Sequence, residues 1–98
     1  MAYRTEFTPA AIRDLRRLPK GVQTAIVSAI GSLADTPRPH GYEKIEGSGD
    51  IYRIRCGDYR VLYKILDDVL TVLIVRTRHR REVYKAHLAV GETAVIAL

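Results

Sequence analysis

Three consecutive runs rich in apolar, β-forming residues, separated by two-residue turns, constrain the fold more than any other feature of this chain. Gly57-Asp58 and Asp67-Asp68 form the turns, and connections this short join antiparallel strands. The strands expected from this pattern cover residues 51–56, 59–66 and 69–76. We therefore predict an antiparallel meander that the rest of the chain must cover.

The N-terminal part of the chain predicts a short strand followed by a helical hairpin. Residues 3–7 alternate weakly, as a strand does. Thr8 is a good N-cap and Pro9 suits the first position of a helix, which we expect to run to about Leu18. Apolar residues at helical spacing then predict a second helix over about 20–35.

The expected order of elements is β-α-α-β-β-β-β-α. A short edge strand at Tyr42–Glu46 precedes the meander, and a short helix containing Val83 and Tyr84 follows it. Residues 89–98 form an apolar tail to which the pattern assigns no structure. The chain is thus predicted to be a single α+β domain, in which the hairpin covers one face of a small, mostly antiparallel sheet and the other face carries function.

Composition narrows the class of protein. A chain of 98 residues, 47% of them hydrophobic, has room for one domain with a modest core. Cys56 is the single cysteine, so an internal disulfide is excluded, and no zinc-ligand spacing is present. No apolar stretch reaches the roughly 20 residues of a membrane helix, and the first residues lack the apolar region of a signal peptide. We expect a cytoplasmic protein without metal or cofactor.

The net positive charge of the chain lies in its C-terminal half. Between residues 53 and 85 lie nine of the sixteen Lys and Arg but only four of the eleven Asp and Glu, so this segment carries the whole net charge of +5. The basic residues are Arg53, Arg55, Arg60, Lys64, Arg76, Arg78, Arg80, Arg81 and Lys85. A positive field confined to one region is typical of a surface that binds a polyanion.

The alternation of side chains along a strand predicts where these arginines point. Because Tyr59, Val61, Tyr63 and Ile65 form an apolar side that suits the helices, the opposite side should carry Arg60. By the same pattern Arg53 and Arg55 reach that open face. Three neighbouring guanidinium groups are compatible with a bound anion between them or with wide spacing in solvent. Arginine suits phosphate, because its planar fork binds two oxygens at once.

A second basic cluster, residues 76–81, leaves the end of the third meander strand. Such a run is often a solvated surface, but here it emerges beside the face that carries the other arginines. We expect backbone-phosphate contacts from four basic residues, namely Lys64, Arg76, Arg80 and Arg81.

At this point the chain resembles the toxins of the RelE/ParE superfamily, and most closely the RelE branch. The resemblance covers about residues 2–88 and rests on three segments. These are Ile51-Tyr52-Arg53-Ile54-Arg55, Asp58-Tyr59-Arg60-Val61-Leu62-Tyr63 and Arg78-His79-Arg80-Arg81-Glu82-Val83-Tyr84. The resemblance implies a messenger-RNA endonuclease that acts in the ribosomal A site. It also implies a cognate antitoxin that neutralises the toxin in a higher-order complex, and the net charge of +5 leads us to expect that this antitoxin is acidic.

The resemblance also implies roles for individual residues. Arg60 and Arg78 match the arginines that grip the scissile phosphate, and Tyr84 matches the tyrosine that lies by the nucleophile and orients the substrate. Arg53 and Arg55 stand where the best-known RelE-type member has two lysines. Arginine stays protonated and is a poor proton carrier. Tyr84 and His79 are therefore the two candidates for the base.

Three other functional hypotheses are compatible with the sequence. A ParE-like toxin shares the fold but inhibits DNA gyrase, and a non-catalytic module would bind RNA or the ribosome without cutting. A basic structural protein would have no site at all. The combination of the arginines with Tyr84 favours the nuclease.

Overall fold

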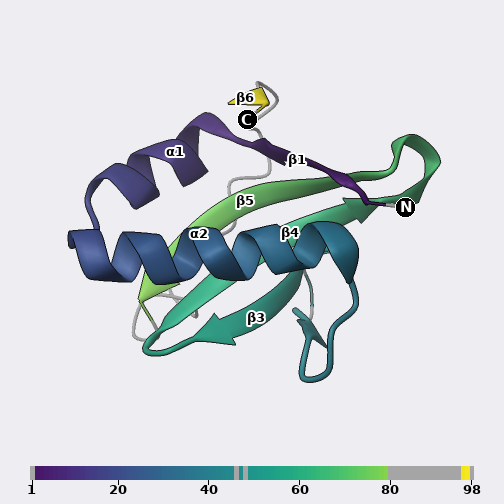
Figure 1. The fold of residues 1–98 in the computed structure, drawn as a ribbon. Helices are drawn as coiled ribbons and strands as arrows, with labels where there is room; N and C mark the ends of the chain where they lie inside the picture. The colour runs from purple at the N-terminus through teal and green to yellow at the C-terminus, as the bar shows by residue number, and fades with distance from the viewer. Residues whose placement is uncertain (1, 46, 48, 80–95, 98) are drawn as a thin grey trace.

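The computed structural model describes residues 2–45, 47, 49–79 and 96–97 of the chain (Figure 1). Its elements are β1 (Arg4–Phe7), α1 (Pro9–Arg16), α2 (Lys20–Asp35), β2 (Glu43–Lys44), β3 (Tyr52–Cys56), β4 (Tyr59–Leu66), a 3-10 turn (Asp67–Val69), β5 (Thr71–His79) and β6 (Ile96–Ala97). The strands form one sheet in the order β2-β3-β4-β5-β1-β6. The predicted α+β class is confirmed.

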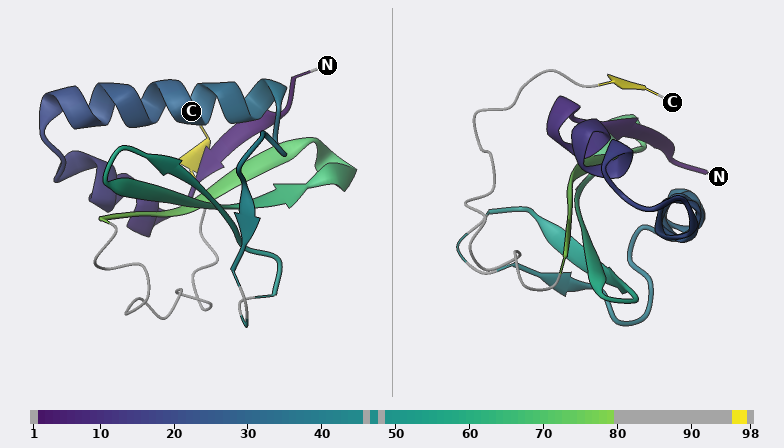
Figure 2. Two further views of the ribbon diagram at one scale, coloured as in Figure 1. Left: turned by 90° about the horizontal axis from the view of Figure 1, so that it is seen from below. Right: turned by 90° about the vertical axis from the view of Figure 1, so that its left-hand side faces the viewer.

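The helical hairpin forms where the sequence predicts it. Thr8 caps α1, since its Oγ1 accepts a hydrogen bond of 3.1 Å from the Ala11 amide, and Pro9 stands in the first turn. Helix α2 lies across one face of the sheet, while α1 lies beside β5 (Figures 1 and 2). Neither helix has the length and apolar character that a membrane span requires, and this holds for the described part of the chain.

The meander is antiparallel, as its short turns predict. Cys56 pairs with Tyr59 around Gly57-Asp58, and Gly57 has a φ of 61°, a left-handed conformation that glycine adopts without strain. Strand β1 joins the other side of β5 in parallel, and β6 pairs antiparallel with β1. Among the described strands the sheet is therefore mixed, with β1 and β5 forming its one parallel pair.

The third meander strand is shifted from its predicted position. The sequence predicts residues 69–76, but the chain first makes a 3-10 turn and passes through Leu70, whose φ is 46°, before β5 begins at Thr71. At its other end β5 continues to His79, because residues 77–79 pair with the first residues of β4. The predicted helix with Val83 and Tyr84 lies outside the described residues.

Two apolar clusters lie on opposite faces of the sheet. The main core packs between the helices and the sheet. Its buried members are Phe7, Ala11, Leu15, Ile26, Ile30, Leu33, Val61, Tyr63, Val72 and Ile74. A smaller cluster of Ile51, Leu62 and Val75 is buried on the face turned away from the helices. That face is therefore not wholly polar, and the arginines stand beside an apolar patch.

Candidate active site

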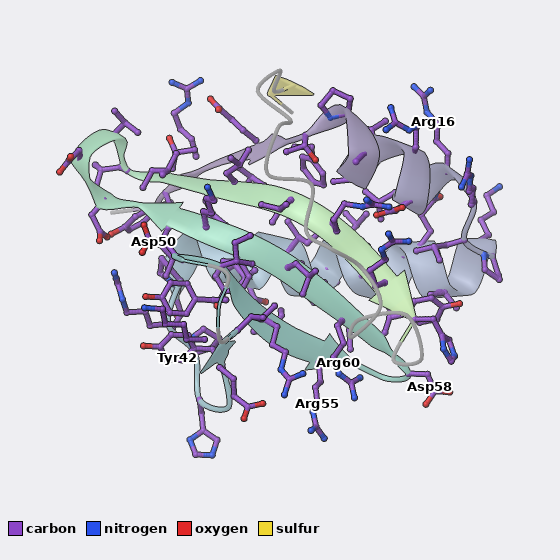
Figure 3. All side chains as sticks on the ribbon, turned by 180° about the vertical axis from the view of Figure 1, so that it is seen from behind. Arg16, Tyr42, Asp50, Arg55, Asp58 and Arg60 are labelled. Atoms are coloured by element: carbon purple, nitrogen blue, oxygen red, sulfur yellow. The ribbon has the colours of Figure 1, made fainter. Side chains whose placement is uncertain are left out.

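Three arginines form one row across the face of the sheet that the helices leave uncovered. Arg55 of β3 is directly opposite Arg60 of β4, and Arg60 is directly opposite Arg78 of β5. Cβ atoms of directly opposed residues lie about 4.5–5.5 Å apart, and their side chains share a face. Figure 3 shows Arg55 and Arg60 pointing away from the sheet near the same end. Arg55 is exposed, whereas Arg60 and Arg78 are half-buried.

A β-bulge brings Arg78 into this row. From Leu66 opposite Thr71 to Tyr63 opposite Ile74 the register is regular, but Leu62 then faces Arg76. Val75 is the extra residue. An extra residue reverses which face the following side chains occupy, and bulges commonly redirect a side chain in this way. Without it, Arg78 would stand opposite Tyr59 on the helix-covered face.

The electrostatics of the row favour an anion. Like charges on directly opposed strand positions repel, so negative charge placed among the three guanidinium groups is stabilising. A phosphate group supplies that charge and matches the fork of each guanidinium. The strands thus hold three such forks in one line, which suits the backbone of a nucleic acid.

Arg53 stands in the next row of the same face. It is directly opposite Leu62 on one side and Glu43 of β2 on the other, and its guanidinium forms an ion pair of 3.0 Å with Glu43. Its side chain is only 15% exposed. Arg53 therefore supports the positive potential beside the row while part of its charge is balanced by Glu43.

Arg76 takes a different position from the phosphate contact that the sequence predicts. Its Nε and one terminal nitrogen donate hydrogen bonds of 2.9 and 3.1 Å to the two carboxylate oxygens of Asp14 on α1. The backbone amide of Thr77 donates a third, of 2.9 Å, to the same carboxylate. The guanidinium of Arg76 is thus engaged within the protein.

His79 and Lys64 lie apart from the row. The His79 ring packs edge-on against Tyr59 with 5.3 Å between ring centroids, and Tyr59 packs against the main core. His79 therefore occupies the opposite face from Arg60. Lys64 shares the face of Arg60, but four residues further along β4, a distance of about 13 Å. Three predicted site residues, Arg80, Arg81 and Tyr84, lie outside the described residues.

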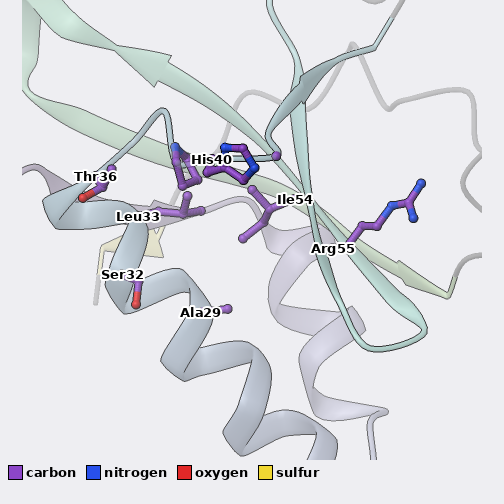
Figure 4. Close-up of a pocket in the computed structure, with 9 residues that line it drawn as sticks. Ala29, Ser32, Leu33, Thr36, His40, Ile54 and Arg55 are labelled. Carbon is purple, nitrogen blue, oxygen red and sulfur yellow. The ribbon is translucent and has the colours of Figure 1, made fainter.

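Sequence reasoning missed Asp14 and a groove on the other side of β3. The burial of Asp14 could have been predicted from the sequence, because Asp14 lies on the same side of α1 as Ala10, Ala11 and Leu15, which are buried. The groove, of about 580 Å³, runs between α2, the following loop and β3 (Figure 4). Its lining is Ala29, Ser32, Leu33, Thr36, Pro39, His40, Gly41, Ile54 and Arg55. Only tertiary packing brings these segments together.

Metal ligation has no candidate within the described ranges, where no three His, Cys, Asp or Glu side chains come together. The site that the described residues offer is therefore cationic, built from guanidinium groups on a rigid sheet. Such a site can bind a phosphodiester and stabilise negative charge that develops on it.

Comparisons with known proteins agree with one another. The sequence model of a family described as the ParE toxin of the type II toxin–antitoxin system parDE matches residues 5–84. Toxin RelG of Mycobacterium tuberculosis is 37% identical over 86 residues, which are 87% of this chain and 99% of that protein. The mRNA interferase toxin RelE of Escherichia coli is 30% identical over 88 residues, 86% of this chain and 92% of that one. The solved toxin–antitoxin complex RelBE2 of M. tuberculosis contains a chain 35% identical, with a TM-score of 0.73, covering 82% of this chain and 100% of that one.

Proposed function

Because this chain belongs to the ParE toxin family of type II toxin–antitoxin systems and is a RelE-type toxin, we propose that it cleaves messenger RNA in the ribosomal A site. The observation that carries the proposal is the row of Arg55, Arg60 and Arg78 across three neighbouring strands. The name of the E. coli relative, an mRNA interferase toxin, supports the same class of reaction.

The proposed reaction uses the 2′-hydroxyl of the RNA as nucleophile and needs no metal ion. A bond forms between the 2′-oxygen and phosphorus, in line with the bond to the 5′-oxygen, which breaks. The products are a 2′,3′-cyclic phosphate and a 5′-hydroxyl. A base takes the proton of the 2′-hydroxyl and an acid supplies one to the departing oxygen. The phosphorane formed on the way carries additional negative charge.

Each arginine has a role in this scheme. Arg60 and Arg78 bind the non-bridging oxygens of the scissile phosphate and stabilise their growing charge. Arg55, at the exposed end of the row, binds the neighbouring part of the RNA backbone. Arg53 adds positive potential from the next row. The half-buried position of Arg60 and Arg78 supports their assignment, because partial exclusion of water strengthens electrostatic stabilisation.

Proton transfer needs a residue outside the row, since arginine keeps its proton up to about pH 12 and beyond. We assign the base to Tyr84, because His79 lies against Tyr59 on the other face of the sheet. A site with so few proton carriers is a weak nuclease alone. The ribosome then contributes rate by holding the message in line for attack, so free RNA should be cut far more slowly.

A cognate antitoxin completes the proposed system. The net charge of +5 favours an acidic partner. The chain from M. tuberculosis that this protein resembles was solved as a toxin–antitoxin complex. We expect the antitoxin to place carboxylates near the arginine row and to block RNA binding, within a higher-order complex in the cytoplasm.

The test is cleavage of a defined message on purified ribosomes, with end mapping that detects the cyclic phosphate. We expect cleavage by the intact protein and a loss of at least about 100-fold for Arg78→Ala. Arg16→Ala is the matched control, because Arg16 is exposed on α1, away from the row (Figure 3). Control and wild type should cut at the same rate.

Other results would overturn the proposal. Tight ribosome binding without any cut message would indicate a non-catalytic module. Inhibition of DNA gyrase by the wild type, with ribosome-bound message left intact, would indicate a ParE-like activity. Equal loss in Arg16→Ala and Arg78→Ala would show that total charge matters and that the row does not.

A further inference from the structure

The edge of β5 changes its neighbour halfway along the strand. Strand β1 pairs with β5 only as far as Phe7 opposite Ile74. Beyond that point, residues of α1 and its N-cap contact this edge of β5. The Thr8 amide donates a 3.0 Å hydrogen bond to the Ile74 carbonyl, and Thr8 Oγ1 donates one of 2.7 Å to the Val75 carbonyl. The helix therefore replaces a strand as the partner of this edge.

Asp14, nearly two turns further along α1, continues this contact. Its buried carboxylate accepts hydrogen bonds from the Thr77 amide and from the Arg76 side chain, at 2.9–3.1 Å. Thr8 and Asp14 together thus hold the three residues that contain and follow the bulge. A buried ion pair of this kind is weak evidence for stability, because an apolar pair of similar size often does as well. In some proteins such a pair instead specifies one conformation.

The geometry at stake is the register of β5 against β4. The regular register would continue with Val75 opposite Leu62 and would carry Arg78 opposite Tyr59. The observed register instead places Arg78 opposite Arg60. Both registers keep the strand hydrogen-bonded to β4, and the edge contacts from Thr8 and Asp14 accompany the observed one.

We propose that Thr8 and Asp14 are positioning residues that hold the bulge at Val75 and thereby keep Arg78 in the arginine row. The inference rests on the proposed function for its effect on cleavage, but its structural part does not. Neither residue reaches the RNA. Both act through Arg78, whose guanidinium would otherwise leave the scissile phosphate.

The first test is single-turnover cleavage of ribosome-bound message with excess toxin. For Asp14→Asn and for Thr8→Val we expect the maximal rate to fall by about 10- to 100-fold with little change in the half-saturating concentration, since misplacement of a catalytic group lowers rate more than binding. Thr8→Ser keeps the hydroxyl and should restore the rate. Asp67→Asn is the matched control, because Asp67 also pairs with an arginine but lies at the other end of β4 and β5.

A double mutant separates positioning from a general structural defect. If Asp14 acts through Arg78, then Asp14→Asn should lower the rate no further once Arg78 is alanine. If the rate loss of the double mutant equalled the product of the two single-mutant losses, the proposal would be overturned. So would a folded Asp14→Asn or Thr8→Val protein with the maximal rate of the wild type.

A second measurement needs no activity and also serves if the substituted proteins fold poorly. Cross-strand NOEs between Arg60 and Arg78 report the bulged register, and NOEs between Tyr63 and Ile74 report the regular part of the same strand pair. Thr8→Val should weaken the first set and keep the second. If the Arg60–Arg78 NOEs were unchanged in Thr8→Val, the proposed positioning role would be wrong. If the wild type cuts no RNA, the proposed function fails, and these NOEs alone decide the positioning role.

Discussion

The two ends of the β4–β5 hairpin hold the same kind of ion pair in different surroundings. At the row end, Asp14 binds Arg76 and a backbone amide, and its side chain is 9% exposed. At the turn end, Asp67 binds Arg38 at 2.8 Å and accepts a hydrogen bond of 2.7 Å from the Tyr3 hydroxyl, with its side chain 52% exposed. The number of bonds is similar, so the comparison isolates the effect of burial.

The difference in burial indicates at which end of the hairpin a polar contact can control the backbone conformation. Water competes with every bond of the exposed pair, and salt screens it, so breaking it changes little. The buried carboxylate has no such substitute, and its donors lose their acceptor if it is removed. The end of the hairpin that carries the arginine row is therefore the end whose conformation a single side chain can control.

The largest expected effect separates the two ends by activity. If the proposed function holds, Arg60→Ala should lower cleavage of ribosome-bound message by about 100- to 1,000-fold, because the substitution removes a proposed donor to the developing charge. Lys64→Ala removes one positive charge from the same face of β4, nearer the turn, and should lower the rate only a few-fold. Similar losses in both variants would contradict a localised site.

A smaller effect separates the two aspartates by stability. We expect Asp14→Asn to lower the free energy of unfolding by about 2 kcal/mol, or roughly 10 °C in Tm, because a partly buried arginine loses its charged partner. Asp67→Asn should shift the urea midpoint much less. Urea and thermal unfolding of both variants beside the wild type measure the difference, and a larger loss for Asp67→Asn would reverse our interpretation of burial.

The smallest effect concerns the pH dependence of the turn end. Hydrogen bonds from Arg38 and Tyr3 hold the pKa of Asp67 below its ordinary value. Because the folded pKa is the lower one, the stabilisation is present above the unfolded pKa of about 3.9 and is lost as pH falls through the folded value. An NMR titration of the Asp67 carboxyl carbon should show the low midpoint, and Arg38→Ala should return it toward normal. A midpoint unaffected by Arg38→Ala would rule out this cause.

Much of the fold follows from local pattern. Thr8 and Pro9 mark the start of α1, the two-residue turn at Gly57-Asp58 determines the pairing of β3 with β4, and each of these features lies within a few residues of its effect. The turn before β5 was less predictable. Leu70 adopts a left-handed conformation, which sequence analysis expects at glycine and not at leucine. For this reason β5 begins later than its apolar run suggests.

The sequence by itself determined that Arg55 and Arg60 share a face, since simple alternation on two strands joined by a tight turn is enough. It also indicated the family, through residues that are near one another along the chain. Only the tertiary structure decided the positions of Arg76, Arg78 and His79. A one-residue bulge reverses alternation, and the contacts that hold it come from α1, more than 60 residues away in sequence. The local sequence pattern cannot predict such a contact, because these hydrogen bonds form only when the helix and the strand pack together.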